Sequence, residues 1–243
     1  MGELKREITA LRSIARDYLA PGADSVLRQA ESALDAIAVS RGSAVRWQVS
    51  ASNPILTQQS QGEYMPAAEG ELHVYAAVTF IWELLPLHPS GVVGRPATDV
   101  ELVGLASTLV RVMEGNPGAH LDGHEIARWR MEVGDARAPG THFHVQVLGN
   151  DELGPFPKSL DIPRLPGIII SPLACVEYVI AELFQDRWPA TASRDTGAMG
   201  VWSGIQRTRL QRQLSWHGTQ LDRAASSPWV AIKTGKPPVD LFL

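Results

Sequence analysis

Two neighbouring runs in which apolar and polar residues alternate constrain the fold of this chain most strongly. The first is IARWRMEV (126–133) and the second is THFHVQV (141–147), and the residues between them include glycine and proline. Alternation with a period of two is typical of a strand with one buried face, and glycine and proline between two such runs indicate a turn. The sequence therefore predicts an antiparallel hairpin of 126–133 with 142–149.

The chain before this hairpin indicates two helices and two further strands. Apolar residues recur at spacings of three and four in 4–18 and again in 27–37, with a Pro-Gly break between the two segments, which predicts two amphipathic helices. Segments 44–51 and 71–84 are rich in β-branched and aromatic residues, so we expect a strand in each. The polar segment between these strands is expected to be a loop.

Three more helices are predicted from capping residues and apolar spacing. Thr98 and Glu101 form a capping-box pair at the start of the first one. Its apolar residues are Leu102, Leu105, Leu109 and Val112. Ser171 and Pro172 provide an N-cap and a first-turn proline for the second helix. The third helix, 205–224, is basic and has one apolar stripe, made of Leu210, Leu214, His217 and Leu221.

Helices and consecutive strands that do not alternate regularly favour an α+β fold over a parallel α/β fold. We therefore predict an antiparallel sheet packed against the N-terminal helices, followed by a C-terminal helical element. The core domain is expected at 1–190 and the helical element at 191–243, and the sequence leaves open whether they form one domain. A chain of 243 residues is long enough to bury a substantial core.

Composition and charge argue against several classes of protein. Hydrophobic residues make up 44% and charged residues 20% of the chain, which is typical of a globular protein. A net charge of −4 argues against non-specific nucleic-acid binding. The N-terminal segment is charged, and no run of about 18 apolar residues exists, so we expect a cytoplasmic protein with no signal peptide and no membrane partner. The single cysteine, Cys175, cannot form an intrachain disulfide, and we expect it to be reduced and buried.

The histidines and the glutamine of the second alternating run are the main candidates for function. Successive side chains of a strand point to opposite faces, so His142, His144 and Gln146 share one face. A neutral imidazole is a nucleophile at neutral pH, a second imidazole can pass a proton, and an amide can donate to a phosphoryl oxygen. The stretch therefore suits the binding of a phosphoryl group or an attack on it.

The pattern His-x-His-x-Gln, with the strand, glycine-containing turn and strand around it, resembles the histidine-triad superfamily. It is most similar to the hexose-phosphate uridylyltransferase branch, in which glutamine replaces the third histidine, and the resemblance covers about residues 98–150. It implies an enzyme that transfers or hydrolyses nucleotidyl or phosphoryl groups of nucleotide-like phosphate esters, with no cofactor. By this resemblance His144 is the nucleophile and His142 supports it. Gln146 holds a phosphoryl oxygen, and Thr141 contacts a phosphate.

Three residues after the predicted hairpin are further candidates. Lys158 and Arg164 lie in a proline-rich segment directly downstream of it, where they could bind a substrate phosphate. Cys175 lies near the start of the helix capped by Ser171, where the helix dipole could lower its thiol pKa. A lone cysteine is nevertheless more often a small core residue.

Two other interpretations remain open. His120, His124, His142 and His144 could together form a site for zinc or another divalent metal. Alternatively, the protein is a non-catalytic α+β interaction module or accessory subunit, and its histidines are incidental residues of a half-solvated strand. The basic helix 205–224 then either packs against the core or docks a partner protein. The sequence alone does not decide between an enzyme and an interaction module.

Overall fold

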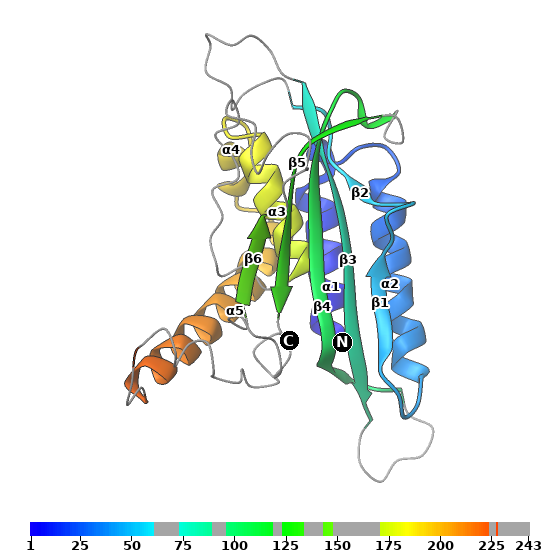
Figure 1. The fold of residues 1–243 in the computed structure, drawn as a ribbon, viewed down its shortest axis with the longest axis vertical. Coiled ribbons are helices and arrows are strands. Elements are labelled where there is room, and N and C mark those ends of the chain that lie inside the picture. The colour runs from blue at the N-terminus through cyan, green and yellow to red at the C-terminus, as the bar shows by residue number, and fades with distance from the viewer. Residues whose placement is uncertain are drawn as a thin grey trace.

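The computed structural model describes residues 1–60, 73–88, 96–118, 123–133, 143–147, 171–223 and 227. Within them, helices and an antiparallel sheet form the α+β fold that the sequence predicts (Figure 1). In these ranges no helix is both long enough and apolar enough to cross a membrane.

The helices include the two that the N-terminal periodicity predicts. In chain order they are α1 (Gly2–Ile14), the 3-10 helix η1 (Arg16–Tyr18), α2 (Ala23–Val39), α3 (Pro172–Leu183), α4 (Trp188–Ala192) and α5 (Gly197–Asp222). Leu4, Ile8 and Leu11 of α1 are completely buried, as their spacing predicts. Gly22, which precedes α2, has φ of 96°, a left-handed conformation that glycine adopts without steric cost.

The strands form a single sheet in which every pairing is antiparallel. They are β1 (Val45–Val49), β2 (Ile55–Leu56), β3 (Val74–Leu87), β4 (Asp99–Glu114), β5 (His124–Val133) and β6 (Phe143–Val147). Their order across the sheet is β1-β3-β4-β5-β6, and β2 pairs with β3 as well. This arrangement confirms the predicted strands at 44–51 and 71–84 and the predicted hairpin of 126–133 with 142–149.

The predicted helix at the Thr98–Glu101 pair is wrong, because these residues belong to β4 and to the turn before it. Leucines spaced by three and four also fit one face of a helix, and the capping pair strengthened that interpretation. However, β4 contains four valines, and almost its whole length pairs with β3. β-branched residues favour a strand, and this long-range pairing outweighs a local capping signal.

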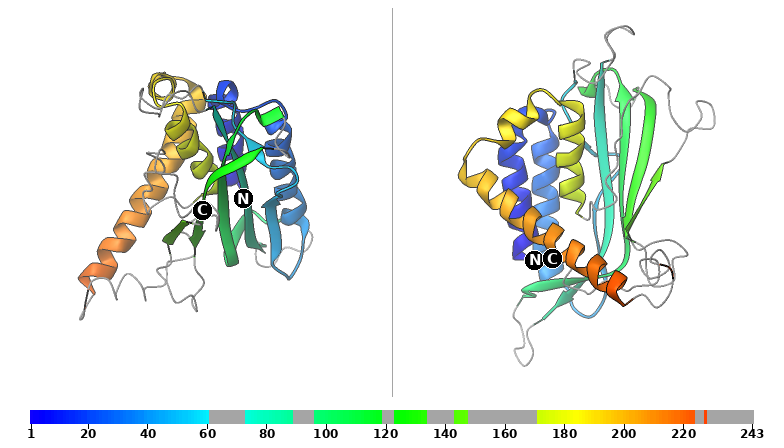
Figure 2. Two further views of the ribbon diagram at one scale, coloured as in Figure 1. Left: turned by 45° about the horizontal axis from the view of Figure 1, so that its top comes forward. Right: turned by 90° about the vertical axis from the view of Figure 1, so that its left-hand side faces the viewer.

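Helices cover one face of the sheet, and the core lies between the two layers. The right-hand view of Figure 2 shows α1, α2 and α3 side by side against this face. Trp47, Trp82 and Trp129 point into the core from the middle of their strands and are almost completely buried. The other face of the sheet, made by the alternate residues of each strand, is therefore directed away from these helices.

The start of α3 follows the predicted capping pattern. Ser171 Oγ accepts hydrogen bonds from the backbone N–H groups of Leu173 and Ala174, at 3.1 and 3.4 Å, and Pro172 occupies the first turn. Cys175 follows in the same helix and is completely buried, as predicted. This burial raises the pKa of its thiol, which argues against the alternative that Cys175 is a nucleophile.

Candidate functional site

The candidate site lies where β5 and β6 pair, on the face of the sheet that is directed away from the helices. In the register, Glu132 lies opposite His144 and Arg130 lies opposite Gln146. Trp129 and Met131, which alternate with these residues, are buried on the core side. Val145 and Phe143 of β6 also pack against buried apolar residues, so the apolar side of this strand is the inner one, as the alternation predicts.

His144 and Glu132 form the central contact of this site. The distance between His144 Nε2 and Glu132 Oε2 is 3.2 Å, and the side chains are 22% and 17% exposed, so solvent reaches the pair. An ionised carboxylate only accepts hydrogen bonds, so Nε2 of the imidazole donates to it. A carboxylate in this position fixes the orientation of the ring and stabilises an imidazolium.

Two further side chains hold the carboxylate of Glu132 in place. Ser107 of β4 donates its hydroxyl to Glu132 Oε1 at 3.2 Å, and Arg130 Nη1 lies 3.4 Å from the same oxygen. The first oxygen of Glu132 therefore binds these two donors, and the second contacts His144. The arrangement spans three adjacent strands, which restricts the rotamers available to the carboxylate.

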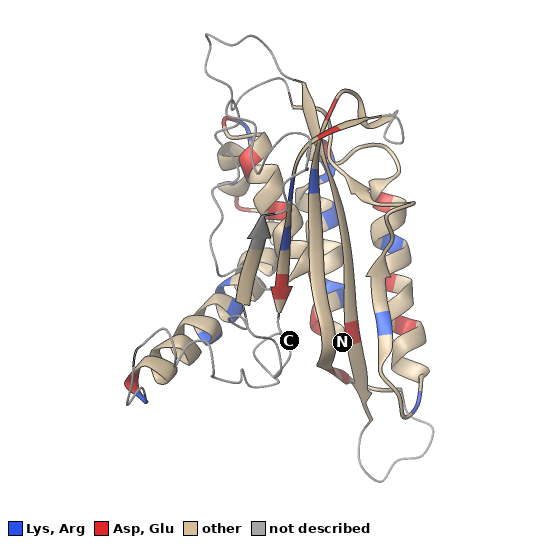
Figure 3. Cartoon of the chain, in the orientation of Figure 1, with Lys and Arg blue, Asp and Glu red and all other residues tan. Residues whose placement is uncertain are grey.

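More ionisable side chains lie further along the same part of the sheet. Figure 3 shows blue and red bands together on β4 and β5. Arg111 and Arg128 lie opposite each other in the register, and Glu125 bridges them. Arg111 Nε donates to Glu125 Oε2 at 2.5 Å, and Arg128 Nε donates to Glu125 Oε1. With Arg130 and Glu132, the described residues of this surface provide three guanidinium groups and two carboxylates, an excess of one positive charge that favours an anion.

The structure brings together only part of the residue set that the sequence predicts. His144 and Gln146 are both in β6. The other predicted substrate-binding or catalytic residues lie outside the described residues; they are Thr141, His142, Lys158 and Arg164.

The proposed four-histidine metal site is divided by the strand register. His124 is the first residue of β5 and pairs with Glu114, whereas His144 pairs with Glu132, eight residues further along β5. At about 3.3 Å per residue this separation is roughly 26 Å, so His124 and His144 cannot bind one ion. His120, like His142, lies outside the described residues. The part of the chain that the structure describes contains no group of three or more His, Cys, Asp or Glu arranged to hold a metal.

The residues around His144 were not found by sequence reasoning. Glu132 was part of the predicted hairpin, but the length of the connection between the two strands leaves the register undetermined, and the register alone identifies it as the neighbour of His144. Ser107 was assigned to a helix, where it could not have reached Glu132. The alternation within 126–133 was the available signal, because it places Arg130 and Glu132 on the same face.

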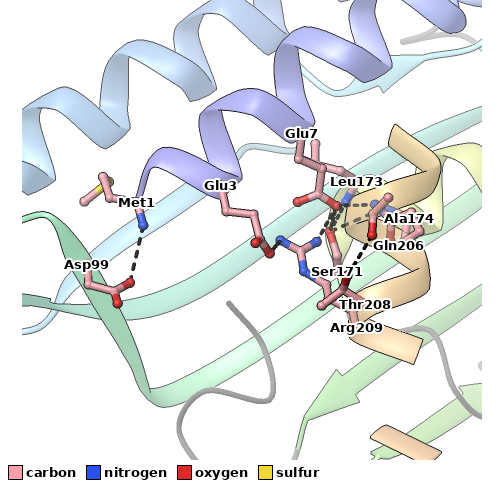
Figure 4. A network of polar contacts seen from close by, with 11 residues as sticks. Met1, Glu3, Glu7, Asp99, Ser171, Leu173, Ala174, Gln206, Thr208 and Arg209 are labelled. Carbon is pink, nitrogen blue, oxygen red and sulfur yellow. Dashed lines mark hydrogen bonds and ion pairs between the residues drawn. The ribbon is translucent and has the colours of Figure 1, made fainter. Parts of the chain in front are cut away.

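A second cluster of charged residues joins α1, α3 and α5, but it lies in the interior (Figure 4). Ser171 Oγ and Gln206 Nε2 donate to Oε1 of Glu7 at 2.7 and 2.8 Å, and Arg209 Nη1 forms an ion pair with the same oxygen at 2.5 Å. Arg209 Nη2 also lies 3.2 Å from Glu3 Oε1. Because Glu7 and Arg209 are buried, we assign this cluster a structural role, which is to fix α5 against α1 and α3.

The apolar stripe of the last helix is not packed against the core. Leu210, Leu214 and Leu221 are 37%, 57% and 44% exposed. The neighbouring side of α5 carries the buried residues Arg209, Gln213 and Trp216. The predicted basic helix is therefore present with its leucines on the surface, and Trp216, in its C-terminal half, packs against Phe143 of β6.

Comparisons of the chain with models of protein families, with curated proteins and with solved structures gave no match. The fold and the site define an α+β protein with a histidine–carboxylate pair on the outer face of an antiparallel sheet.

Proposed function

We propose that this protein is a phosphoryl- or nucleotidyl-transferring enzyme or hydrolase that acts on nucleotide-like phosphate esters at the β5–β6 face. The observation that carries the proposal is the contact between His144 and Glu132, which holds an imidazole on a solvent-accessible surface. The resemblance of His142, His144 and Gln146 to the histidine-triad pattern supports the same chemistry.

His144 is the nucleophile in this proposal, and Glu132 orients it. With Nε2 directed at the carboxylate, Nδ1 is the ring atom that attacks phosphorus. The new N–P bond forms as the bond from phosphorus to the leaving oxygen breaks, and the leaving group takes that electron pair. Water or an acceptor alcohol then attacks phosphorus and restores the imidazole. Glu132 stabilises the positive charge of the ring while the N–P bond exists.

The arginines of the same face provide the binding energy for the anion. Arg130 contacts Glu132 at 3.4 Å, and a substrate phosphate that approaches His144 reaches its guanidinium group as well. Gln146 lies opposite Arg130 in the register, which agrees with the role in holding a phosphoryl oxygen that the resemblance implies.

The experiment compares wild type with His144→Asn, with His124→Asn as the matched control. His124 is an exposed histidine at the far end of β5, so its loss should not change the reaction. Release of nucleoside monophosphate is measured over a panel of nucleotide conjugates, with protein labelled from a radioactive phosphate ester as a second measurement. We expect an acid-labile, base-stable label on wild type and on His124→Asn, and no label or turnover with His144→Asn. Equal rates for all three proteins across the panel would reject the proposal.

The exposed leucines of α5 favour a second candidate, an interaction module. The helix that carries the leucine stripe is basic, with Arg207, Arg212 and Arg223. Between Arg207 and Arg223 the sequence has one carboxylate, Asp222. A partner with an apolar centre bordered by carboxylates would complement this surface. Fluorescence anisotropy with a labelled amphipathic peptide of leucine and glutamate, compared with its scrambled sequence, tests this candidate. Equal binding of the two peptides, or unchanged binding with Leu214→Glu, would contradict it.

A further inference from the structure

A groove lies on the helical layer, where the end of α1, η1 and the start of α2 meet. It has a volume of about 590 Å³, which is within the range of small-molecule sites. Its lining includes Arg12, Arg16, Leu19, Asp24, Arg28 and Gln58. His144 and Glu132 are not part of this lining, because they belong to the opposite face of the sheet.

The charged side chains of this groove are mostly arginines. Asp24 is their one carboxylate in the described lining, and it binds two of them, Arg12 Nε at 2.7 Å and Arg28 Nε at 2.8 Å. Glu31, which follows Asp24 by two turns of α2, lies 3.3 Å from Arg12 Nη1 and forms a second ion pair with this guanidinium group. Arg16 is exposed and forms no ion pair with any residue that the structure describes. With Glu31 included, the three arginines exceed the two carboxylates by one positive charge, and Arg16 is the arginine that neither carboxylate pairs with.

The rest of the lining matches a ligand with an apolar body. Leu19, Ala20 and Pro21 form an apolar wall, and Thr9 and Ser13 add hydroxyl groups. Gly22 has no side chain, and a Cβ placed there would meet no atom within 4 Å, so the groove is open at the start of α2. The N-terminus of α2 has no side-chain cap, and its positive end adds to the attraction for an anion.

We propose that this groove binds a small phosphate monoester whose phosphate contacts the arginines and whose organic group lies on the apolar wall. A phosphomonoester presents three terminal oxygens and up to two negative charges to these guanidinium groups, whereas a carboxylate presents two oxygens and one charge. Arginine forks match phosphate oxygens in geometry as well as in charge. Arg16 forms no ion pair with a described residue and so has donors for the phosphate, and Glu31 orients Arg12.

Replacement of Asp24 tests the proposal, because the proposal predicts the direction in which ligand affinity changes. It is 53% exposed and holds two of the arginines, which also hold the pKa of its carboxyl below the usual value. Replacing it by asparagine removes its repulsion of the phosphate and releases both guanidinium groups. Asp24→Asn should therefore tighten the binding of a phosphate monoester, whereas it would weaken the binding of a cation.

The experiment uses phenylphosphonate, a dianion with an aromatic group and a C–P bond that phosphate hydrolysis does not cleave. Binding to the full chain is measured by isothermal titration calorimetry. Inorganic phosphate serves as a probe without the apolar group, and benzenesulfonate serves as a probe without the second negative charge. We expect phenylphosphonate to bind more tightly than either of them, and its affinity to fall as salt concentration rises.

The variants separate this groove from other sites. Arg16→Ala should weaken phenylphosphonate binding by about tenfold, because a charge-assisted contact is lost. Arg6→Ala is the control, since Arg6 is an exposed arginine of α1 outside the lining. Arg16→Ala should leave the turnover of the proposed enzyme unchanged, because Arg16 is not part of the β5–β6 face, so failure here is distinguishable from failure of the proposed enzyme activity. Unchanged affinity with Arg16→Ala, weaker affinity with Asp24→Asn, or equal affinity for phenylphosphonate and inorganic phosphate would overturn the proposal.

Discussion

Glu7 of α1 and Arg209 of α5 form an ion pair at 2.5 Å, although 0% of Glu7 and 2% of Arg209 is exposed. Removal of Glu7 leaves the buried charge of Arg209 with only its longer contact to Glu3, at 3.2 Å, among the described residues. We therefore expect Glu7→Ala to lower the free energy of unfolding by about 3 to 5 kcal/mol. Urea unfolding followed by circular dichroism measures this loss.

An exposed ion pair between α1 and α2 provides the control for this measurement. Lys5 and Asp35 are in contact on the surface, so Lys5→Ala should cost no more than about 1 kcal/mol. The double variant Glu7→Leu with Arg209→Met removes both buried charges and should be more stable than Glu7→Ala. Similar losses for Glu7→Ala and Lys5→Ala would show that the buried pair does not fix α5.

The contact chain Ser107–Glu132–His144 predicts a graded series of catalytic defects under the proposed function. Glu132→Gln removes the charge that stabilises the imidazolium, so we expect kcat to fall by about a hundredfold. KM should change less, because Glu132 contacts His144 and not the substrate. Ser107→Ala removes one of the donors to Glu132, at 3.2 Å, and should reduce kcat by only a few-fold, about three- to tenfold. Steady-state kinetics over the same substrate panel measures the series, and a kcat unaffected by Glu132→Gln would remove Glu132 from the mechanism.

The hairpin of β5 and β6 was predictable from the sequence because its alternation is local. The alternation within each run shows which of its residues face the core, and glycine and proline mark the turn between the runs. The β4 strand was not predictable in the same way, since its leucines fit a helical spacing and only the pairing with β3 decides between the two structures. Local patterns thus identified the fold class, and a long-range contact corrected one element.

The candidate site, like the fold, could be predicted from the sequence only in part. The shared strand face of His144 and Gln146 follows from sequence spacing, but the contact with Glu132 depends on the register of two strands. In the groove, Arg12 and Arg16 are four residues apart, and so are Asp24 and Arg28. This spacing predicts that the two members of each pair lie near each other. Nothing in the spacing shows that these two pairs face each other, because that depends on how α1 and α2 pack.

The exposed stripe of α5 predicts where substitutions in this helix will be tolerated. Leu214 is 57% exposed, so Leu214→Glu should change the free energy of unfolding by no more than about 0.5 kcal/mol. Trp216 is buried against Phe143, with ring centroids 5.5 Å apart, and Trp216→Ala should cost about 3 kcal/mol or more. Chemical denaturation compares the two variants. A larger loss for Leu214→Glu than for Trp216→Ala would mean that the leucine stripe is the packed face.

His217 predicts a dependence of stability on pH. Its ring lies 4.8 Å from that of Trp216 and 5.8 Å from that of Phe143, and its Nδ1 is buried with no hydrogen-bond partner among the described residues. Burial lowers the pKa of this imidazole from the model-peptide value of 6.5, so the folded protein takes up the proton at lower pH than the unfolded chain does. Above that value both states are neutral and the contribution of His217 is complete; as pH falls below it, the unfolded state binds the proton first and stability is lost.

His217→Phe should abolish this loss while it keeps the aromatic packing. The difference in the free energy of unfolding between wild type and His217→Phe, measured between pH 5 and pH 7.5, should therefore shift in favour of the variant as pH falls. A difference for His217→Phe that does not vary with pH would mean that this imidazole titrates equally in both states.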